Sequence, residues 1–261
     1  MYILAIETTG AFASVAVAEA AWKNSKITYF DIIGHIDGHD KFSHLQNLTP
    51  QIERVLRENE LSIGDISGIA VSCGPGSFTG IRIGVSTARA LSQVTGIPCI
   101  AVSSLEAMAL RQADLVRQRG TVICPVIDAR RNQIYGGGFC IESEGEPANC
   151  EISSVIEAGP YTVREFMEKI AERGDMDISF MGDGIDKYSA LINETAEELG
   201  ISAGRISYVG EECRYQDADA VAMLGAKAAA AGKTCGFEQL KPDYMRPAEA
   251  ERKIKDQTNN G

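Results

Sequence analysis

The sequence predicts an α/β fold of two lobes. Strand-like and helix-like segments alternate along most of the 261 residues, as they do in α/β proteins. Two separate stretches of the chain repeat one theme, because each begins with a hairpin of strands and continues with helices. The chain is also long enough to bury a hydrophobic core in one large domain or in two small ones.

The first lobe is expected to begin with three strands, at residues 2–7, 13–20 and 26–36. The turn TTGAF joins the first two strands into a hairpin. Residues 40–59 then predict an amphipathic helix, since apolar side chains recur there at mostly three- and four-residue intervals. Pro50 inside this segment indicates either a kink or a helix start with Thr49 as its N-cap.

Alternating elements complete the first lobe, at residues 66–73 (strand), 85–96 (helix), 98–103 (strand) and 104–118 (helix). The order βββαβαβα fits the RNase H-like core found in actin and in sugar kinases. The second lobe repeats the theme at residues 121–128 (strand), 133–142 (strand), 162–174 (helix), 177–185 (strand) and 186–200 (helix). A polar stretch, residues 142–160, precedes its first helix.

These elements predict the limits of the two lobes. We expect the first lobe at residues 1–103, completed by an Ala-rich helix at 217–232 that returns to it. The second lobe is expected at residues 104–216 and a C-terminal tail at 233–261. The end of this tail, Lys253–Gly261, is polar and expected to fray.

The charge of the chain limits its partners. The chain has 36 acidic and 25 basic residues, which gives a net charge of −11. A protein whose main task is to grip a polyanion needs a basic surface. The composition therefore argues against autonomous nucleic-acid binding and permits a role beside a basic partner.

The cysteines and the first residues indicate a cytoplasmic protein. The seven cysteines occur singly, and an odd number without a CxxC pair argues against a disulfide framework and a zinc cage. Met1 leads directly into a strand-like run, without the basic region of a signal peptide. No apolar run is long enough to span a membrane.

A glycine-rich loop, GPGSFTGIRIG at residues 74–84, lies between a predicted strand and a predicted helix. A phosphate-binding P-loop needs a lysine, and none occurs between Gly74 and Gly96. The dinucleotide-binding pattern needs a glycine at position 79, where Thr79 stands. Backbone amides at the start of the helix retain the capacity to bind an anion weakly.

The spacing of the glycines favours another role for this loop. Gly76, Gly80, Gly84 and Ala88 are four residues apart and share one helical face. Glycine inside a helix costs about 1 kcal/mol relative to alanine, so close approach of another backbone is the simplest reason for it. That backbone belongs either to the same chain or to a partner, and the spacing leaves both open.

Two further patterns carry possible chemistry. His35, His39 and His44 lie close together in the sequence, which is compatible with a metal site, although the glycines among them favour a solvated turn. The turn Glu7–Gly10, with Thr8 and Thr9 between, either faces nucleotide phosphates and magnesium, as the equivalent turn does in sugar kinases, or is a capped hairpin turn.

Two polar turns offer further candidate sites, and a nucleophile motif is missing. MGDG, at residues 181–184, is similar to the adenosine-side turn of the same fold. The segment Asp128–Tyr135, DARRNQIY, offers either an anion site or a polar turn. The sequence contains no GxSxG motif, and no cysteine lies near a histidine. No nucleophile is therefore indicated, and no catalytic residue is predicted.

Several sequence blocks resemble the bacterial TsaB family, also called YeaZ. They are ILAIETTGAFASVAVAE, VSCGPGSFTGIRIGVSTARAL, GIPCIAVSSLEAMA, PVIDARRNQIYGG, MGDG and LKPDYMRPAEAE. They occur in the family's order and span nearly the whole chain. The block Gly-Pro-Gly-Ser-Phe-Thr-Gly-x-Arg-x-Gly is highly specific for the family.

The resemblance implies a two-lobed actin-like ATPase fold (ASKHA, RNase H-like) and a non-catalytic role in making threonylcarbamoyladenosine on tRNA. The implied partner is TsaD, the paralogue that transfers the threonylcarbamoyl group to adenosine 37 of tRNAs reading codons that start with adenine. TsaE, a small ATPase, joins through the same assembly, and tRNA is contacted only indirectly. No tightly bound cofactor is expected, and binding of ATP or ADP at the interface with TsaD is left open.

Three positions bear on the absence of catalysis. TsaD carries two metal-binding histidines four residues apart, and the shared Leu-Glu aligns them with Ser104 and Met108. A hydroxyl and a thioether are poor substitutes for imidazole on a hard or borderline divalent ion. The family usually has Asp where this chain has Glu7, which weakens the case for tight nucleotide binding.

The surface predicted to meet TsaD, or a second copy of the chain when TsaD is absent, follows the glycine face and the preceding helix. It comprises Gly76, Gly80, Arg82, Gly84, Ala88, Leu91, Leu45, Leu48 and Ile52. On this hypothesis Gly84→Leu abolishes the complex and leaves the monomer folded. The alternative is a small metal- or ATP-dependent enzyme, a phosphotransferase or a peptidase-like protein.

Overall fold

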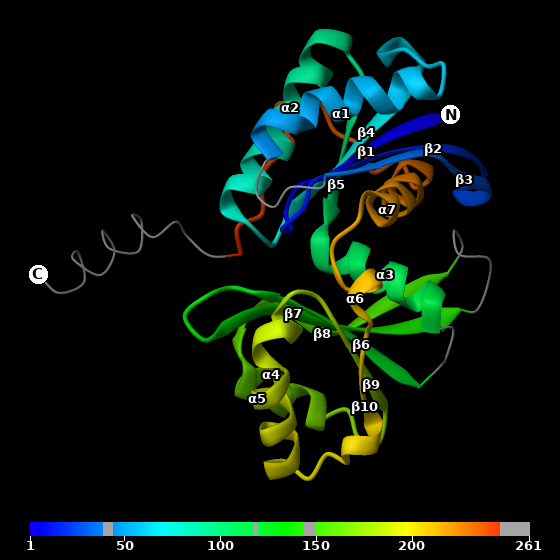
Figure 1. Cartoon of the computed structure of the whole chain (residues 1–261). Coiled ribbons are helices and arrows are strands. Elements are labelled where there is room, and N and C mark those ends of the chain that lie inside the picture. The colour runs from blue at the N-terminus through cyan, green and yellow to red at the C-terminus, as the bar shows by residue number, and fades with distance from the viewer. Residues whose placement is uncertain (39–43, 117–119, 144–149, 246–261) are drawn as a thin grey trace, which may run out of the picture.

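The computed structural model describes residues 1–38, 44–116, 120–143 and 150–245, which form two lobes. The lobes lie one above the other in Figure 1. Helix α3 (Ser104–Val116) and the short helix α6 (Glu211–Arg214) lie between them. Among the described helices, none is both long and apolar enough to cross a membrane.

The first lobe is built on a five-stranded sheet in the order β3-β2-β1-β4-β5. Strands β1, β2 and β3 are antiparallel neighbours, whereas β4 and β5 run parallel to β1. The strand bounds are Tyr2–Glu7 (β1), Ser14–Lys23 (β2), Lys26–Asp37 (β3), Ile66–Gly74 (β4) and Cys99–Ser103 (β5).

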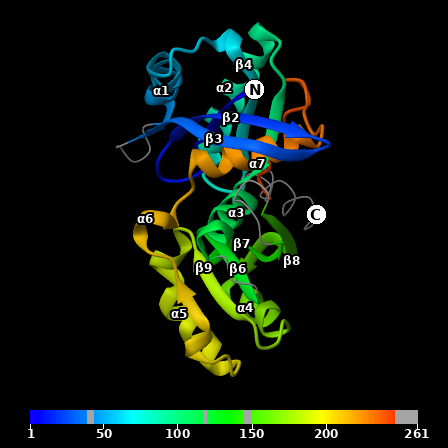
Figure 2. The same ribbon diagram turned by 90° about the vertical axis from the view of Figure 1, so that its right-hand side faces the viewer.

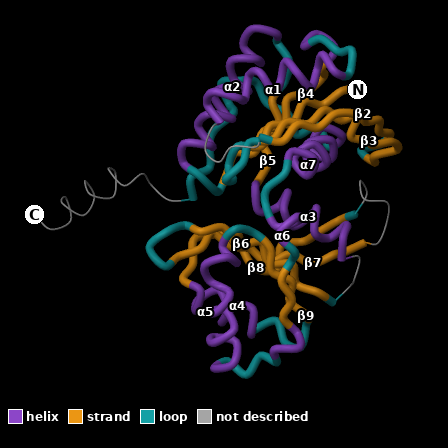
Figure 3. Tube along the Cα trace, viewed as in Figure 1, coloured by secondary structure: helices purple, strands orange, loops and turns teal. Residues whose placement is uncertain are grey.

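Helices cover both faces of this sheet (Figures 1 and 3). Helices α1 (His44–Glu58) and α2 (Phe78–Thr95) lie on one face and α7 (Ala218–Ala230) on the other. In β1, Leu4 and Ile6 join the core beneath α1 and α2, while Ile3 and Ala5 join the core beneath α7. A strand buried on both sides is apolar throughout, which explains the run YILAI.

Helix α7 lies very close to the sheet, because both contact surfaces carry small side chains. Ala16 and Ala18 of β2 and Ala70 of β4 share one buried cluster with the alanines of α7. A Cβ atom on Gly225 would lie only 2.6 Å from the Cβ of Ala70. The Ala-rich composition of α7 is therefore a consequence of its short distance from the sheet.

The second lobe repeats the topology of the first. Its sheet has the order β10-β9-β6-β7-β8, with β6, β7 and β8 antiparallel and β9 and β10 parallel to β6. The bounds are Thr121–Asp128 (β6), Gln133–Ser143 (β7), Glu151–Thr162 (β8), Asp177–Met181 (β9) and Ile206–Tyr208 (β10).

Two helices and the connecting helix complete the second lobe. Helices α4 (Val163–Ala171) and α5 (Gly184–Glu198) share one core with its sheet, and α3 packs on the other face. Short 3₁₀ turns precede β4 and β10, at Ile63–Asp65 and Ala203–Arg205. The duplicated β-sheet order with flanking helices confirms the predicted actin-like, RNase H-like fold class.

Two details of the predicted elements need correction. Helix α1 runs through Pro50 from His44, so the helix start at Pro50 with Thr49 as N-cap is wrong. Pro50 lies on the exposed side of the helix, where water can satisfy the carbonyl group that loses its amide partner. The polar stretch 142–160 contains most of β8, whose backbone pairs with β7.

The start of the expected C-terminal tail is part of the first lobe. Cys235 and Cys99 exchange two backbone hydrogen bonds, of 2.9 and 2.8 Å, at the edge of the first sheet. Leu240 is completely buried in the core beneath α1 and α2. The predicted frayed end, Lys253–Gly261, lies outside the described residues.

We predict that Gly225→Ala lowers the free energy of unfolding by about 1–3 kcal/mol, because an added methyl group overpacks the contact of α7 with Ala70. The overpacking must exceed the helix propensity that alanine adds. Urea unfolding of the chain measures the change. Gly204→Ala is the matched control, since its Cβ would lie 3.8 Å from the nearest side-chain atom. A Gly225→Ala protein as stable as the wild type contradicts the close contact.

Candidate functional site

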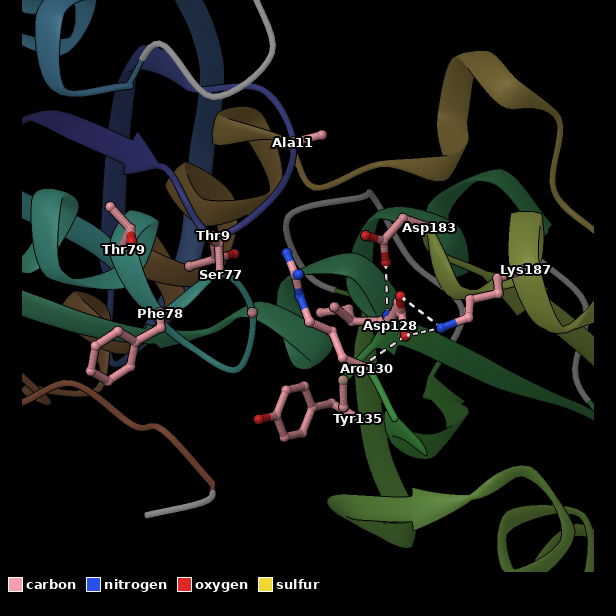
Figure 4. Close-up of a pocket in the computed structure, with 13 residues that line it drawn as sticks. Thr9, Ala11, Ser77, Phe78, Thr79, Asp128, Arg130, Tyr135, Asp183 and Lys187 are labelled. Atoms are coloured by element: carbon pink, nitrogen blue, oxygen red, sulfur yellow. Dashed lines mark hydrogen bonds and ion pairs between the residues drawn. The ribbon is translucent and has the colours of Figure 1, made fainter. Parts of the chain in front are cut away.

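The two lobes enclose a cleft of about 820 Å³ (Figure 4). The first lobe contributes the β1–β2 turn and the start of α2. The second lobe contributes the end of β6, the β6–β7 turn and the start of α5. The described lining residues are Thr9, Ala11, Gly76, Ser77, Phe78, Thr79, Ile127, Asp128, Ala129, Arg130, Tyr135, Asp183 and Lys187.

The acidic residue at the end of β1 is buried, and one of its carboxylate oxygens is engaged within the chain. Glu7 is 1% exposed, and its Oε1 accepts hydrogen bonds from the backbone N–H and the hydroxyl of Thr9, at 2.5 and 2.6 Å. Burial raises the pKa of this carboxyl above its ordinary value, although the hydrogen bonds from Thr9 oppose the rise. The structure thus places Glu7 beneath the turn and not on the wall of the cleft, as expected for a capped hairpin turn.

A chain of hydroxyl groups continues from this turn toward α3. The hydroxyl of Thr9 lies 3.1 Å from that of Ser104, which in turn lies 2.8 Å from the hydroxyl of Ser72. Ser72 and Ser104 are completely buried and Thr9 nearly so. These hydrogen bonds tie together β1, β4 and α3, the elements that meet at the base of the cleft.

The glycine-rich loop packs against the same turn. The Thr8 hydroxyl donates to the carbonyl oxygen of Gly80 at 2.8 Å, and the N–H of Ser77 donates to the carbonyl oxygen of Thr9 at 2.8 Å. A Cβ atom on Gly80 would overlap the carbonyl oxygen of Thr8, and one on Gly84 would overlap the Thr8 hydroxyl. The backbone that approaches these glycines is therefore that of the chain itself.

This packing corrects the predicted partner interface. Gly80, Gly84 and Ala88 are buried on the inner face of α2, and Leu48 and Ile52 are buried on the inner face of α1. None of these five positions is free for another chain. Because a Cβ at Gly84 would overlap the Thr8 hydroxyl, we now expect Gly84→Leu to destabilise the monomer itself. Among the described side chains of that set, Arg82 is exposed and Gly76 and Leu91 are partly exposed, while the side chain of Leu45 lies outside the described part.

Arg82 belongs to a small aromatic cluster at the start of α2. Its guanidinium carbon lies 4.0 Å from the centre of the Phe78 ring, and its Nε donates to the Tyr244 hydroxyl at 3.1 Å. The Phe78 and Tyr244 rings are 4.9 Å apart. Tyr244 comes from the C-terminal segment, so spacing within the glycine-rich loop gives no signal for it.

The positions aligned with the TsaD histidines do not fit a metal ion. The hydroxyl of Ser104 is engaged by Thr9 and Ser72. Met108 is 2% exposed and lies in an apolar cluster with Leu105 and Ile123. A hydrogen-bonded hydroxyl and a thioether surrounded by hydrocarbon are unsuitable ligands for a hard or borderline divalent ion.

The second-lobe wall is an ion-paired turn. Asp128 accepts hydrogen bonds from Lys187 at 3.3 Å and from the Tyr188 hydroxyl at 2.9 Å. Asp183 accepts one from the N–H of Asp128 at 3.1 Å, and burial raises the pKa of this carboxyl. Glycine is required at position 182 of the MGDG turn, because φ is +104° and the carbonyl of Val126 leaves no space for a Cβ.

The β6–β7 turn has an unusual backbone. Arg130, Arg131 and Asn132 have φ values of 61°, 54° and 59°, a left-handed conformation that costs about 1–2 kcal/mol per residue. Figure 4 shows the Arg130 side chain reaching from this turn toward Ser77 of the first lobe. The predicted Asp-Arg-Arg cluster is thus divided, with Asp128 organising the turn and Arg130 directed across the cleft.

The three histidines do not all fall within the described side chains. His35 lies on β3, where Asp37 and Asp219 contact its two ring nitrogens. These carboxylates raise the pKa of His35 to about 9. His39 and the side chain of His44 lie outside the described part of the chain, so a shared metal site remains a prediction.

Comparison with known proteins assigns the family. A family model described as TsaD, tRNA N6-adenosine threonylcarbamoyltransferase, matches residues 41–254. The chain is 29% identical to the tRNA threonylcarbamoyladenosine biosynthesis protein TsaB of Bacillus subtilis over 97% of each chain. It is 28% identical to that of Escherichia coli over 97% of this chain and 98% of the relative.

Solved structures agree in fold. A Pseudomonas aeruginosa protein described as similar to peptidase YEAZ covers 94% of this chain with a TM-score of 0.71 and 21% identity, and 99% of that protein is matched. The duplicated lobes around one cleft define a protein of the actin-like class, and the matching model places it in the TsaD family. Within that family, the chain belongs to the TsaB, or YeaZ, group.

We predict that Gly80→Ala lowers the free energy of unfolding by more than about 3 kcal/mol, since the added Cβ must displace the Thr8 backbone or α2. Denaturant unfolding gives the value. Ser86→Ala on the exposed side of α2 is the matched control and should change stability by less than about 0.5 kcal/mol. A stable Gly80→Ala protein would show that the turn and α2 are not in close contact.

Glu7 gives a prediction with a definite pH direction. Burial raises its folded pKa above the ordinary value of 4.5, so the folded state holds the proton longer and stability falls as pH rises from about 4.5 through the folded pKa. Glu7→Gln keeps an acceptor for Thr9 and removes this fall. Glu7→Ala leaves the buried Thr9 amide without its acceptor and should cost about 1–3 kcal/mol below pH 4.5, with a smaller cost at higher pH, where it also removes the penalty of ionising Glu7. Unfolding at several pH values tests both, and an unchanged slope in Glu7→Gln would refute the assignment.

Proposed function

We propose that the chain is a partner subunit that pairs with TsaD and supports threonylcarbamoyl transfer to tRNA. In this proposal TsaD performs the transfer to adenosine 37 of tRNAs that read codons starting with adenine. The curated relatives are named tRNA threonylcarbamoyladenosine biosynthesis protein TsaB, and they match almost the full chain. The names of these relatives support a role in threonylcarbamoyladenosine biosynthesis. The geometry of the site supports a non-catalytic role for this chain beside a catalytic TsaD.

The filled Ser104 and Met108 positions carry the non-catalytic part of the proposal. A serine bonded to two other hydroxyls and a buried methionine occupy the places of the two histidines. Glu7 is also withdrawn beneath the β1–β2 turn, where Thr9 uses its oxygen. The chain therefore contributes surface and shape, and TsaD contributes the reacting groups.

The exposed faces of α1 and α2 are the proposed contact with TsaD. Buried residues of both helices hold them to the sheet, so partner contacts must come from outward side chains such as Arg82 and Leu91. Phe78, 40% exposed, extends this surface at the start of α2. A second copy of the chain covers the same surface when TsaD is absent, because exposed apolar patches favour association.

The remaining partners are proposed from the charge of the chain and from its resemblance to the TsaB family. With a net charge of −11, the chain is proposed to meet tRNA only through its partner. TsaE joins through the same assembly, and ATP or ADP binds at the interface with TsaD rather than tightly to this chain alone.

Reconstitution tests the function. The chain is co-purified with TsaD of the same organism, and modified tRNA is measured with and without the chain. The proposal expects a stable complex and modification that needs both proteins. Modification by this chain alone, or unchanged modification without it, contradicts the proposal. Micromolar binding of Mg-ATP to the isolated chain, lost in Glu7→Ala, would favour the alternative of a small ATP-dependent enzyme.

We predict that Arg82→Glu reduces affinity for TsaD at least 10-fold, since it reverses a charge on the proposed contact surface. The monomer should stay folded, because Arg82 is exposed. Analytical size exclusion with TsaD measures the loss. Lys23→Glu, at the β2–β3 turn, is the matched charge-reversal control. Native affinity in Arg82→Glu would exclude this side of α2 from the interface.

A further inference from the structure

The edge strand β3 lies beside α7 in the first lobe (Figure 2). A histidine and three aspartates gather where this strand meets the start of the helix. His35 and Asp37 come from β3. Asp217 is the N-cap of α7, where its Oδ1 accepts a hydrogen bond from the N–H of Asp219 at 2.7 Å, and Asp219 lies in the first turn of the helix. The His35 Nδ1 lies 2.6 Å from Asp219 Oδ1, and its Nε2 lies 2.9 Å from Asp37 Oδ1. The cluster lies outside the lining of the interlobe cleft and takes no part in the proposed contact with TsaD.

Three of these side chains present a compact set of donor atoms. One ligand atom each from His35, Asp217 and Asp219 lies within 4.8 Å of the others. The side chains are 24%, 14% and 43% exposed, so the group is sheltered and still open to water on the Asp219 side. An imidazole nitrogen with two carboxylate oxygens is a common ligand set for zinc, in which water takes the fourth position.

The fourth side chain orients the histidine. Asp37 accepts a hydrogen bond from Nε2 of His35, which leaves Nδ1 directed at Asp219. A carboxylate that holds the second ring nitrogen of a metal-bound histidine is a recurrent feature of zinc sites. At present Nδ1 shares a proton with Asp219, and two zinc ligands are about 3.3 Å apart in tetrahedral geometry. Insertion of the ion requires the two groups to separate by less than about 1 Å and releases the proton to solvent.

The local charge fits a divalent ion. The three aspartates contribute three negative charges, and Arg111, whose Nη1 lies 3.3 Å from Asp217 Oδ2, contributes one positive charge. When His35 gives up a proton to become a ligand, the group carries a net charge of −2, which a divalent ion neutralises. Magnesium and calcium prefer all-oxygen ligand sets, so the imidazole selects a transition ion.

We propose that His35, Asp217 and Asp219 bind one divalent transition ion of the zinc type, with Asp37 orienting His35. The ion joins β3 to the start of α7. Through Asp217 and Arg111 the link extends to α3, which lies between the lobes. Zinc binding therefore strengthens the attachment of α7 to the first sheet at the point where the chain returns from the second lobe.

Zinc titration of the reduced protein against a chromophoric chelator tests the site. We expect one Zn²⁺ per chain with micromolar affinity, and a loss of at least 100-fold in His35→Gln and in Asp219→Asn. Asp37→Asn keeps all three ligands and should weaken binding about 10–100-fold. Asp175→Asn, which removes a fully exposed carboxylate of the second lobe, is the matched control and should bind as the wild type does.

Two further readouts separate this site from the cysteines and from loss of folding. Co²⁺ in place of Zn²⁺ should bind without a thiolate charge-transfer band. Saturating Zn²⁺ should raise the melting temperature of the wild type and of Asp175→Asn, and leave that of folded His35→Gln unchanged. Three results would overturn the proposal. They are no binding at a Zn²⁺ concentration of about 100 μM, equal affinity of His35→Gln and the wild type for Zn²⁺, and a strong thiolate charge-transfer band with Co²⁺.

Discussion

The contact between the Thr8–Thr9 turn and the start of α2 is the constraint on which the rest of the molecule depends. Thr8 fits over Gly80 and Gly84, and the amide of Ser77 reaches the carbonyl of Thr9. Side chains at the glycines would push α2 away from β1 and β4, and the base of the cleft would open. Because the same turn anchors the hydroxyl chain to Ser104, it also fixes the first residue of α3 and with it the approach to the second lobe.

This contact also determines which groups of the first lobe remain free to bind a ligand in the cleft. The groups at its first-lobe wall that resemble nucleotide-binding elements are engaged by the chain itself, since Glu7 serves Thr9 and the glycines accommodate Thr8. The opposite wall is closed by the pairing of Asp128 with Lys187. The first lobe presents the outer side of α2 to solvent. This arrangement suits a partner subunit of the TsaB family, which we propose is recognised by TsaD.

The sequence predicted the structure well where burial makes apolar side chains recur at regular intervals. It predicted less where segments that are far apart in the sequence come into contact. The order of strand-like and helix-like segments predicted the duplicated α/β lobes. The run of β1 is apolar throughout because both faces of the first sheet are covered. The spacing of Gly80 and Gly84 correctly indicated a close backbone but not that it belongs to Thr8, about 70 residues away. Strand β8 was missed because half of an edge strand faces solvent, and Asp219 and Tyr244 were missed because their partners lie in other parts of the chain.

Native-state hydrogen exchange at the amides of Thr9 and Ser77 tests whether the contact between the turn and α2 holds in the folded protein. Both amides donate inside this contact, to Glu7 and to the Thr9 carbonyl, so we expect exchange only through global unfolding, at a rate unaffected by Mg-ATP. Exchange of either amide by local opening, or a marked slowing when Mg-ATP is added, would contradict it, because the turn would then be free to receive a phosphate.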